Sequence, residues 1–390
     1  AFLNDMEVAN WQWLVMMLFF GGFVFFAPRA KDVKTFFFAS NNQGKQPGLW
    51  LLTSSLVISW IFAKSITNAA DLGQKYGMVG GVAYAAYYLS FLVAGVVLYQ
   101  LRVQGHFKSV HDFLLSRYGK TAVLVFSILI AFRLFNEVWS NTMVIGSYFG
   151  EGGSTGYYTA IVIFTVLTLI YTLKGGMRSS MITDFIQSIL FLALLIILLL
   201  IIFPSEQMNF SNATSSGSWT LLGGLDLFLV ALIQVFSYPF HDSVMTDRAF
   251  LSDAKTTRKA FIYSGIIGFV LILLFSFIGV FANINQLDGA ATLAVAKFFG
   301  TGVMLAMNLI MITSAASTLD SAFSSFSKLI VLDVKWLQPL VANGRWIMIL
   351  MALAGTVPVF LSPTILSATT ISGTMVIGLA PVFLFWKKES

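Results

Sequence analysis

The chain has 390 residues, of which 57% are hydrophobic and only 10% are charged, and its mean hydropathy is +0.84. Soluble domains carry about a quarter charged residues, so this composition excludes an ordinary soluble domain and indicates solvation by lipid. The sequence has no cysteine, which excludes disulfides and thiolate metal sites, and its three histidines are too scattered to form a metal cluster. The net charge of +6 is spread over many loops, which disfavours a nucleic-acid surface.

Long apolar runs follow one another along the chain. A helix needs about 20 apolar residues to cross the hydrocarbon core, and helices satisfy their own backbone groups there. We therefore expect an all-α polytopic membrane protein in which 1–390 form a single transmembrane domain, with one leading helix and ten core helices. The eleven predicted spans are 11–28, 49–70, 77–101, 121–149, 157–173, 181–203, 224–247, 260–282, 300–332, 340–361 and 365–386.

Lysines and arginines gather in alternate loops. Nineteen of them fall in one set of loops and only Lys75 and Lys297 in the other, while Lys64 and Arg133 fall inside predicted spans. Because cytoplasmic loops are enriched in Lys and Arg, the N-terminus is expected outside and the C-terminus in the cytoplasm. The sequence thus predicts a multi-pass protein of the plasma (inner) membrane.

The first charged residues inside the spans are in core helices one and three. The run from Ser59 to Asn68 mixes aromatic side chains and hydroxyls with Lys64, near the middle of a span. Further along, Arg133 and Glu137 are four residues apart, so they share a helical face and are predicted to form a structural ion pair.

Core helices five and six carry the next polar groups. Asp184 is expected about two turns into a helix that begins near Arg178, where it either joins an ion path or pairs with a nearby cytoplasmic cation. The segment from Ser237 to Asp242 contains Pro239, which removes a backbone donor and marks either an interruption or an ordinary kink.

The densest polar run lies in core helix eight. Helical spacing brings its members onto adjoining faces, so an apolar span gains a face of hydroxyl and carboxylate oxygens. Small polar residues also serve helix packing, but this density around an aspartate favours an ion path. The members of this run are Thr313, Ser314, Ser317, Thr318, Asp320, Ser321, Ser324, Ser325 and Ser327.

Taken together, these motifs resemble the sodium:solute symporter family, which includes bacterial proline, sugar, sialic acid and urea carriers. The most specific matches are Gly175-Gly176 followed by Thr183-Asp184-x-x-Gln187, and Ser317-Thr318-x-Asp320-Ser321. The resemblance runs from the leading helix to core helix ten. It implies a LeuT-like fold, with the leading helix 11–28 followed by inverted five-helix repeats at 49–203 and 224–386, and with core helices one and six interrupted beside the substrate.

The resemblance also implies site residues. A sodium site is expected from the carbonyls of Ile58 and Ile61 together with Ser314, Ser317 and Thr318. A second sodium site is expected from Asp184, Asp320 and Ser321, near Ser317. The expected substrate-binding residues are Trp60, Phe62, Lys64, Ser65, Tyr238 and His241.

The leading hypothesis is sodium-coupled import of a small polar organic solute by alternating access, with Na+ as the only cofactor. Lys64 stands where relatives usually have a neutral residue, which favours an amino acid or a carboxylate. One alternative is proton coupling, with Lys64, Asp184 or His241 as the titrating group. Another is a transporter-like domain that senses a solute.

An enzyme is disfavoured, because the sequence has no nucleophile elbow, phosphate loop or metal motif. The expected partners are a small-molecule solute and the lipid bilayer, with no nucleic acid. The sequence leaves the oligomeric state open.

Overall fold

The computed structural model of the chain describes residues 2–204, 208–361 and 373–388, and these ranges contain helices and turns but no strand. The helices are α1 (Phe2–Phe26), α2 (Val33–Phe38), α3 (Leu49–Trp60), α4 (Ala63–Tyr76), α5 (Met78–Ala85), α6 (Ser90–Val103), α7 (Val110–Phe149), α8 (Thr155–Gly175), α9 (Met177–Ile202), α10 (Phe210–Thr214), α11 (Leu225–Gln234), α12 (Ser243–Arg248), α13 (Ala254–Ile284), α14 (Ala291–Phe299), α15 (Thr301–Lys328), α16 (Val341–Thr356) and α18 (Leu379–Leu384). Short 3-10 turns cover Ala86–Leu89, Leu221–Gly223, Tyr238–His241 and Val357–Leu361, and a π-helical turn covers Leu329–Asp333.

Eight described helical runs are long and apolar enough to cross a membrane, which confirms an all-α, multi-pass membrane protein. Helices α3 and α4 form a further span, bent by 59° where they meet, and α11 is a shorter apolar helix. The predicted span 365–386 falls partly on residues outside the described ranges. The eight runs are Val8–Phe26, Met78–Val103, Val110–Phe149, Thr155–Gly175, Met177–Ile202, Ala254–Ile284, Thr301–Asp333 and Val341–Leu361.

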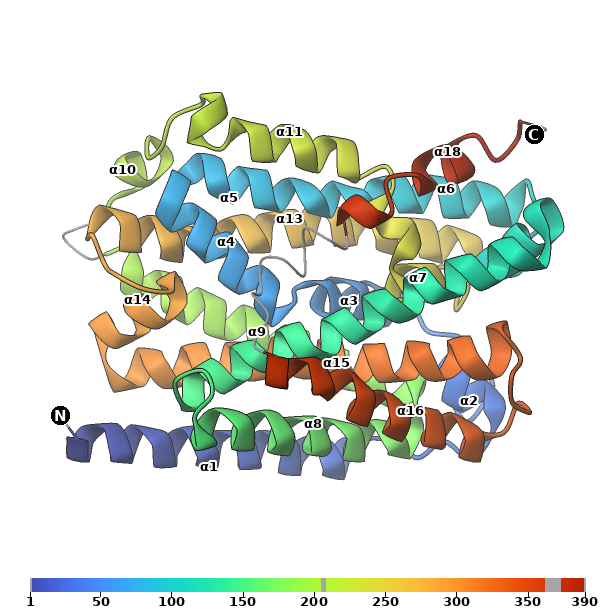
Figure 1. Cartoon of the computed structure of the whole chain (residues 1–390), viewed down its shortest axis with the longest axis horizontal. Coiled ribbons are helices and arrows are strands. Elements are labelled where there is room, and N and C mark those ends of the chain that lie inside the picture. The colour runs from blue at the N-terminus through green and yellow to red at the C-terminus, as the bar shows by residue number, and fades with distance from the viewer. Residues whose placement is uncertain (1, 205–207, 362–372, 389–390) are drawn as a thin grey trace.

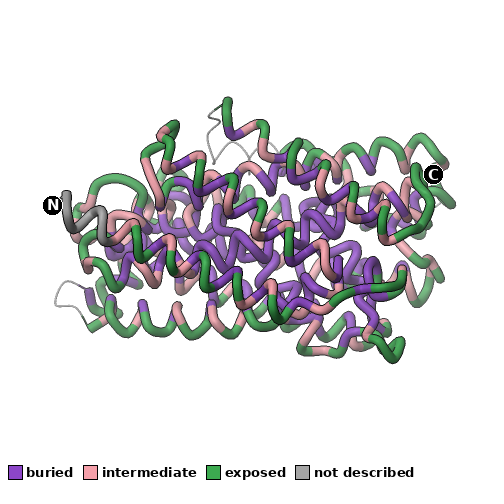
Figure 2. The backbone as a smooth tube through the Cα atoms, turned by 90° about the horizontal axis from the view of Figure 1, so that it is seen from below, coloured by how far each residue is buried: buried purple, intermediate pink, exposed green. Residues whose placement is uncertain are grey.

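The helices run roughly along the long axis of the molecule, and the two termini lie at opposite ends (Figure 1). Helix α7 crosses the others obliquely, while α15 packs against α9, α7 and α16. Helix α13 packs along α4, α3 and α6. Buried residues gather along the centre of the bundle, and the outer helices turn exposed faces away from it (Figure 2). Apolar side chains on those outward faces are suited to contact with lipid.

The first central interruption separates α3 from α4. Ile61 leaves the helical conformation, with φ −80° and ψ 70°, and Phe62 is extended. Neighbouring helices bind the backbone groups that the break releases: Tyr88 donates its hydroxyl to the Trp60 carbonyl at 2.7 Å, and the Lys64 amide donates to the Asn141 side chain at 3.1 Å. The sequence has neither Gly nor Pro at this position, so tertiary contacts hold the break that the family resemblance predicted.

The second interruption lies between α11 and α12, at the segment with Pro239, where the sequence allowed either an interruption or an ordinary kink. Helix α11 ends at Gln234, a 3-10 turn covers Tyr238–His241, and α12 starts after Asp242. The Asp242 side chain caps α12 by accepting the amide hydrogen of Met245 at 3.2 Å. A half-helix thus follows each interruption. The first turn of α4 is held by Asn141 of α7, and the first turn of α12 is held by its own cap, Asp242.

Close approach of α13 to α4 requires a glycine. A Cβ atom on Gly279 would overlap the carbonyl of Ala70 in α4. We predict that Gly279→Ala lowers the free energy of unfolding by about 1–3 kcal/mol, because neither backbone can move without disturbing the packed core. Thermal unfolding of the detergent-purified protein would measure the change. Gly302→Ala is the matched control, because the space around Gly302 in α15 is open; equal melting temperatures for the two variants would contradict the prediction.

Candidate functional site

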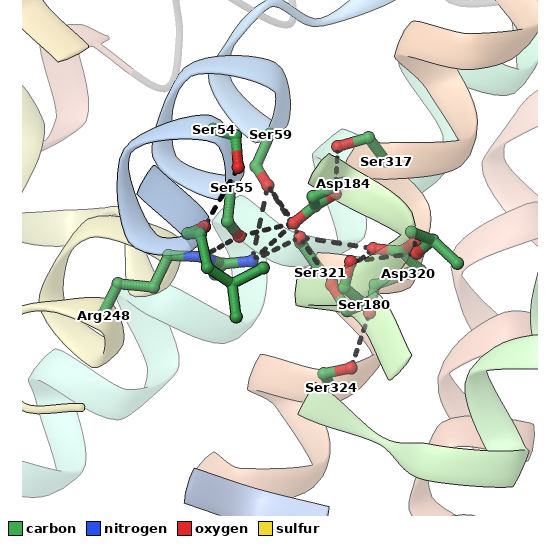
Figure 3. A network of polar contacts seen from close by, with 12 residues as sticks. Ser54, Ser55, Ser59, Ser180, Asp184, Arg248, Ser317, Asp320, Ser321 and Ser324 are labelled. Carbon is green, nitrogen blue, oxygen red and sulfur yellow. Dashed lines mark hydrogen bonds and ion pairs between the residues drawn. The ribbon is translucent and has the colours of Figure 1, made fainter. Parts of the chain in front are cut away.

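The Asp184 carboxylate joins three helices at the centre of the bundle. Asp184 lies in α9 and is fully buried. One of its oxygens accepts hydroxyl hydrogens from Ser55 at 2.5 Å and Ser59 at 3.2 Å, both in α3. The other oxygen accepts from Ser317 of α15 at 2.6 Å, and Figure 3 shows these side chains converging. The predicted approach of Asp184 to core helix eight is thus present in the structure.

The second carboxylate of this cluster, Asp320 of α15, is surrounded by hydroxyl groups. It accepts hydrogen bonds from Tyr171 at 2.5 Å, Ser180 at 2.6 Å and Thr183 at 3.2 Å. The Ser321 hydroxyl lies 3.0 Å from that of Ser59 and 3.2 Å from that of Ser180, which makes the two carboxylate environments continuous. Within the described residues no Lys, Arg or His nitrogen lies within 4 Å of the Asp320 carboxylate.

Arg248 supplies the positive charge of this cluster. It is the last residue of α12 and is fully buried. Its Nε donates to Ser55 at 2.7 Å, and its Nη2 donates to Ser321 at 2.9 Å and to Asp184 at 3.3 Å. The cluster therefore holds two carboxyl groups and one guanidinium, and among the described side chains the guanidinium contacts Asp184 but not Asp320.

The structure corrects the count of Lys and Arg residues in the cytoplasmic loops at two positions. Arg248 and Lys328 are two of the nineteen basic residues counted in the cytoplasmic loops, but both are buried in helices. Lys328 ends α15 and donates to Asp247 at 2.6 Å. A basic residue at the end of a span can reach back along the helix into the protein, and the loop assignment did not consider this.

The structure brings some residues of the predicted first sodium site together. Ser314 donates its hydroxyl to the Ile61 carbonyl at the break between α3 and α4. Ser317 faces Asp184, while Thr318 donates to the Ser314 carbonyl within α15 at 2.9 Å. Ile58 lies buried in the last turn of α3. Hydroxyl, carbonyl and carboxylate oxygens are the ligands that hard cations take, so this donor set fits a sodium ion.

A small cavity lies beside the two helix breaks. Its volume is about 20 Å³, which is enough for a single water molecule. Tyr84 donates its hydroxyl to Ser65 at 3.0 Å at its edge, and no charged residue lines it among those described. The lining residues are Trp60, Phe62, Ser65, Tyr84, Tyr87, Tyr88 and Tyr238. Four of them were predicted; the other three, Tyr84, Tyr87 and Tyr88, were missed, although their spacing places hydroxyl-bearing rings along one span.

Lys64 lies in a buried cluster of charges instead of lining the cavity. Its ammonium donates to Glu137 at 2.9 Å, and Arg133 also binds Glu137, at 2.6 Å, so the predicted Arg133–Glu137 pair is present. Arg133 also reaches Asp242 at 3.2 Å, and Asp242 accepts from the Trp60 indole at 2.9 Å. Two cations therefore meet two carboxylates, and this second cluster is balanced.

His241 is buried next to the cavity-lining Tyr238 without lining the cavity itself. Its Nδ1 lies 2.5 Å from the Tyr238 carbonyl oxygen, and its ring meets the tyrosine ring edge-on with centroids 4.8 Å apart. The histidine thus supports the 3-10 turn that separates α11 from α12.

We predict that Lys64→Met destabilises the protein by about 3–5 kcal/mol, because it leaves Arg133 as the single cation for two buried carboxylates, Glu137 and Asp242. The double variant Lys64→Met/Glu137→Gln should recover most of that loss, since Arg133 then pairs with Asp242 alone. Thermal unfolding of the single and double variants measures both effects. A double variant less stable than Lys64→Met would contradict charge balance as the reason.

Comparisons with known proteins also point to membrane transporters. The model of the sodium:solute symporter family matches residues 38–218, just under half of the chain. This range contains Gly175-Gly176 and Thr183-Asp184-x-x-Gln187, and the Ser317-Thr318-x-Asp320-Ser321 motif lies outside it. Among curated proteins, the chain is 24% identical over 171 residues to the urea-proton symporter DUR3 of Oryza sativa subsp. japonica, covering 43% of this chain and 23% of that protein. It is 21% identical over 245 residues to the probable urea active transporter 2 of Schizosaccharomyces pombe, covering 57% of this chain and 36% of that protein. The matches thus span well under half the length of these relatives.

Two solved structures share the fold. A Na+-coupled sialic acid symporter, in a substrate-bound outward-open state, aligns with TM-score 0.67 and 17% identity over 99% of this chain and 87% of that one. Mhp1, a nucleobase-cation-symport-1 family transporter in a closed conformation with bromovinylhydantoin bound, aligns with TM-score 0.61 and 14% identity over 92% and 77%. The predicted LeuT-like fold is confirmed, and these relatives and neighbours are named as transporters.

Proposed function

Because residues 38–218 match the sodium:solute symporter family, we propose that this chain is a sodium-coupled secondary active symporter that imports a small polar solute by alternating access. The observation that carries the proposal is the buried set of oxygens around Asp184 and Asp320, with hydroxyls from α3, α9 and α15. Hard cations bind such oxygens, and a buried carboxylate is costly without a positive charge beside it. A bound monovalent cation would supply that charge.

Sodium is the first candidate for that charge. The Asp184 carboxylate, the hydroxyls around it and the Ile61 carbonyl offer several oxygens from α3, α9 and α15 within one buried region. A cation bound there would link the broken first core helix to the eighth. Proton coupling is the second candidate, because Asp320 lacks a cationic neighbour and a relative is named as a urea-proton symporter.

The cavity supports a small neutral solute. Lys64 was expected to favour an amino acid or a carboxylate, but its charge is matched by Glu137. The cavity offers aromatic faces and hydroxyl groups, which suit a planar molecule with both hydrogen-bond donors and acceptors. We therefore propose urea or a similar small amide, in agreement with the names of the curated relatives. The cavity must open to admit it.

We further propose that 49–203 and 224–386 are two inverted repeats. Each interrupted helix is then the first helix of its repeat. The chain would begin outside and end in the cytoplasm of a plasma (inner) membrane. Without Arg248 and Lys328, seventeen basic residues still oppose Lys75 and Lys297 in the loop count.

We predict that Asp184→Asn and Ser317→Ala each raise the sodium concentration for half-maximal solute uptake, Asp184→Asn by about tenfold or more, because a charged ligand is lost. Uptake by proteoliposomes in sodium gradients of increasing size measures this. Thr165→Val is the control, because among the described residues the Thr165 hydroxyl donates only to Ile161 of its own helix. Normal sodium dependence in both site variants would refute the cation assignment, and uptake that follows pH but ignores sodium would favour proton coupling.

We predict that urea and small amides, but not carboxylates or amino acids, raise the melting temperature in sodium. Ligand that binds only the folded protein stabilises it by about 2.7 kcal/mol at a hundred times its dissociation constant. The purified protein would be melted with each solute class in sodium and, as the control, in potassium. Stabilisation by carboxylates that Lys64→Met abolishes would restore the lysine as a substrate-binding residue.

A further inference from the structure

The Arg248 guanidinium lies among the oxygens that a cation at Asp184 would need. Its Nη2 is 2.9 Å from the Ser321 hydroxyl, 3.4 Å from the Ser59 hydroxyl and 3.3 Å from the Asp184 carboxylate. Its Nε binds Ser55, which is itself 2.5 Å from the same carboxylate oxygen. Figure 3 shows the guanidinium reaching the cluster from the side opposite Ser317 and Asp320. A sodium ion and this guanidinium would therefore compete for one set of oxygens.

We propose that Arg248 is a tethered cation that occupies the Asp184 oxygens in the absence of metal and that an incoming sodium ion displaces. The inference rests on the proposed cation site and adds the residue that controls its occupancy. Like charges brought together in a buried site repel strongly. The guanidinium must therefore withdraw when the ion binds, or the ion must stay out while the guanidinium remains.

The hydrogen bonding of Arg248 is incomplete, as expected for a side chain that an ion displaces. Its Nη1 is buried and has no hydrogen-bond partner among the described residues. Its contact with Asp184, at 3.3 Å, is longer than the roughly 2.7–2.9 Å of a strong charge-assisted hydrogen bond. Arg133, in contrast, binds Glu137 at 2.6 Å and the Tyr238 hydroxyl at 2.8 Å. The shortest carboxylate contact of Arg248 is thus longer than that of Arg133, although Arg248 also donates to Ser55 at 2.7 Å and to Ser321 at 2.9 Å.

Displacement of Arg248 would affect the wall of the solute cavity through α12. Arg248 ends this helix and ties it to α3, α9 and α15 through the contacts above. Asp242 caps the other end, about 9 Å away at the helical rise, and accepts the indole hydrogen of the cavity-lining Trp60. Release of the guanidinium therefore frees the segment that holds one wall of the cavity, which links ion binding to solute binding.

The test compares sodium binding by the wild type, Arg248→Gln and Arg248→Lys, each with and without Asp184→Asn. The readout is the sodium concentration that gives half of the sodium-specific rise in melting temperature, measured against potassium and without solute. We expect Arg248→Gln to bind sodium about tenfold more tightly, Arg248→Lys to stay near the wild type, and Asp184→Asn to abolish the gain. Arg258→Gln, which removes the same charge at an exposed position, is the control and should change nothing.

Each outcome bears on two proposals, the tethered cation and the sodium-coupled symport. Sodium affinity that is unchanged or weaker in Arg248→Gln, while the wild type responds to sodium, overturns the tethered cation and leaves the proposed symport intact. A response by Arg248→Gln but not by the wild type supports the tethered cation and overturns sodium coupling in the native chain. A response by neither protein overturns both.

A measurement on the wild type covers the case in which Arg248→Gln does not fold. Hydrogen exchange of the amides of residues 243–248 should be faster in sodium than in potassium, because α12 loses its anchor when the guanidinium leaves. Exchange that slows or stays equal in a protein that binds sodium would overturn the proposal.

Discussion

The interaction on which the bundle depends is the burial of the Asp184 carboxylate among three helices. A carboxylate deep in a membrane protein is costly unless hydrogen-bond donors or a positive charge replace its water. Ser55 and Ser59 from α3, Ser317 from α15 and Arg248 from α12 provide this replacement. Because the partners come from three helices far apart in the sequence, the carboxylate fixes how these helices pack.

Two charged clusters lie in one core, and they differ in composition. Around Glu137, two cations and two carboxylates balance, and the cluster holds both helix interruptions to α7. Around Asp184, one guanidinium lies among two carboxyl groups and several hydroxyls, and these oxygens form the proposed cation site. The two clusters are joined by α12, which starts at Asp242 in the first and ends at Arg248 in the second.

Apolar runs predicted most of the spans because lipid imposes one length and one kind of backbone on every segment that crosses it. They could not show the interruption at Ile61, which depends on Tyr88, Asn141 and Ser314 from other helices. Motifs placed Asp184 beside core helix eight correctly. They missed Arg248, because a charge at the end of a span looks like a loop residue until the direction of its side chain is known. Lys64 was read as a free charge, since its partner Glu137 lies 73 residues further along.

The small size of the aromatic cavity has a consequence for energy conservation. A space of about 20 Å³ holds one water molecule, so in this conformation the cavity cannot hold a chain of several waters. In the proposed symporter, the closed aromatic wall would prevent this cavity from serving as a water path for the coupling ion between solutes. The electrochemical work stored in the ion gradient would then remain available for the next solute.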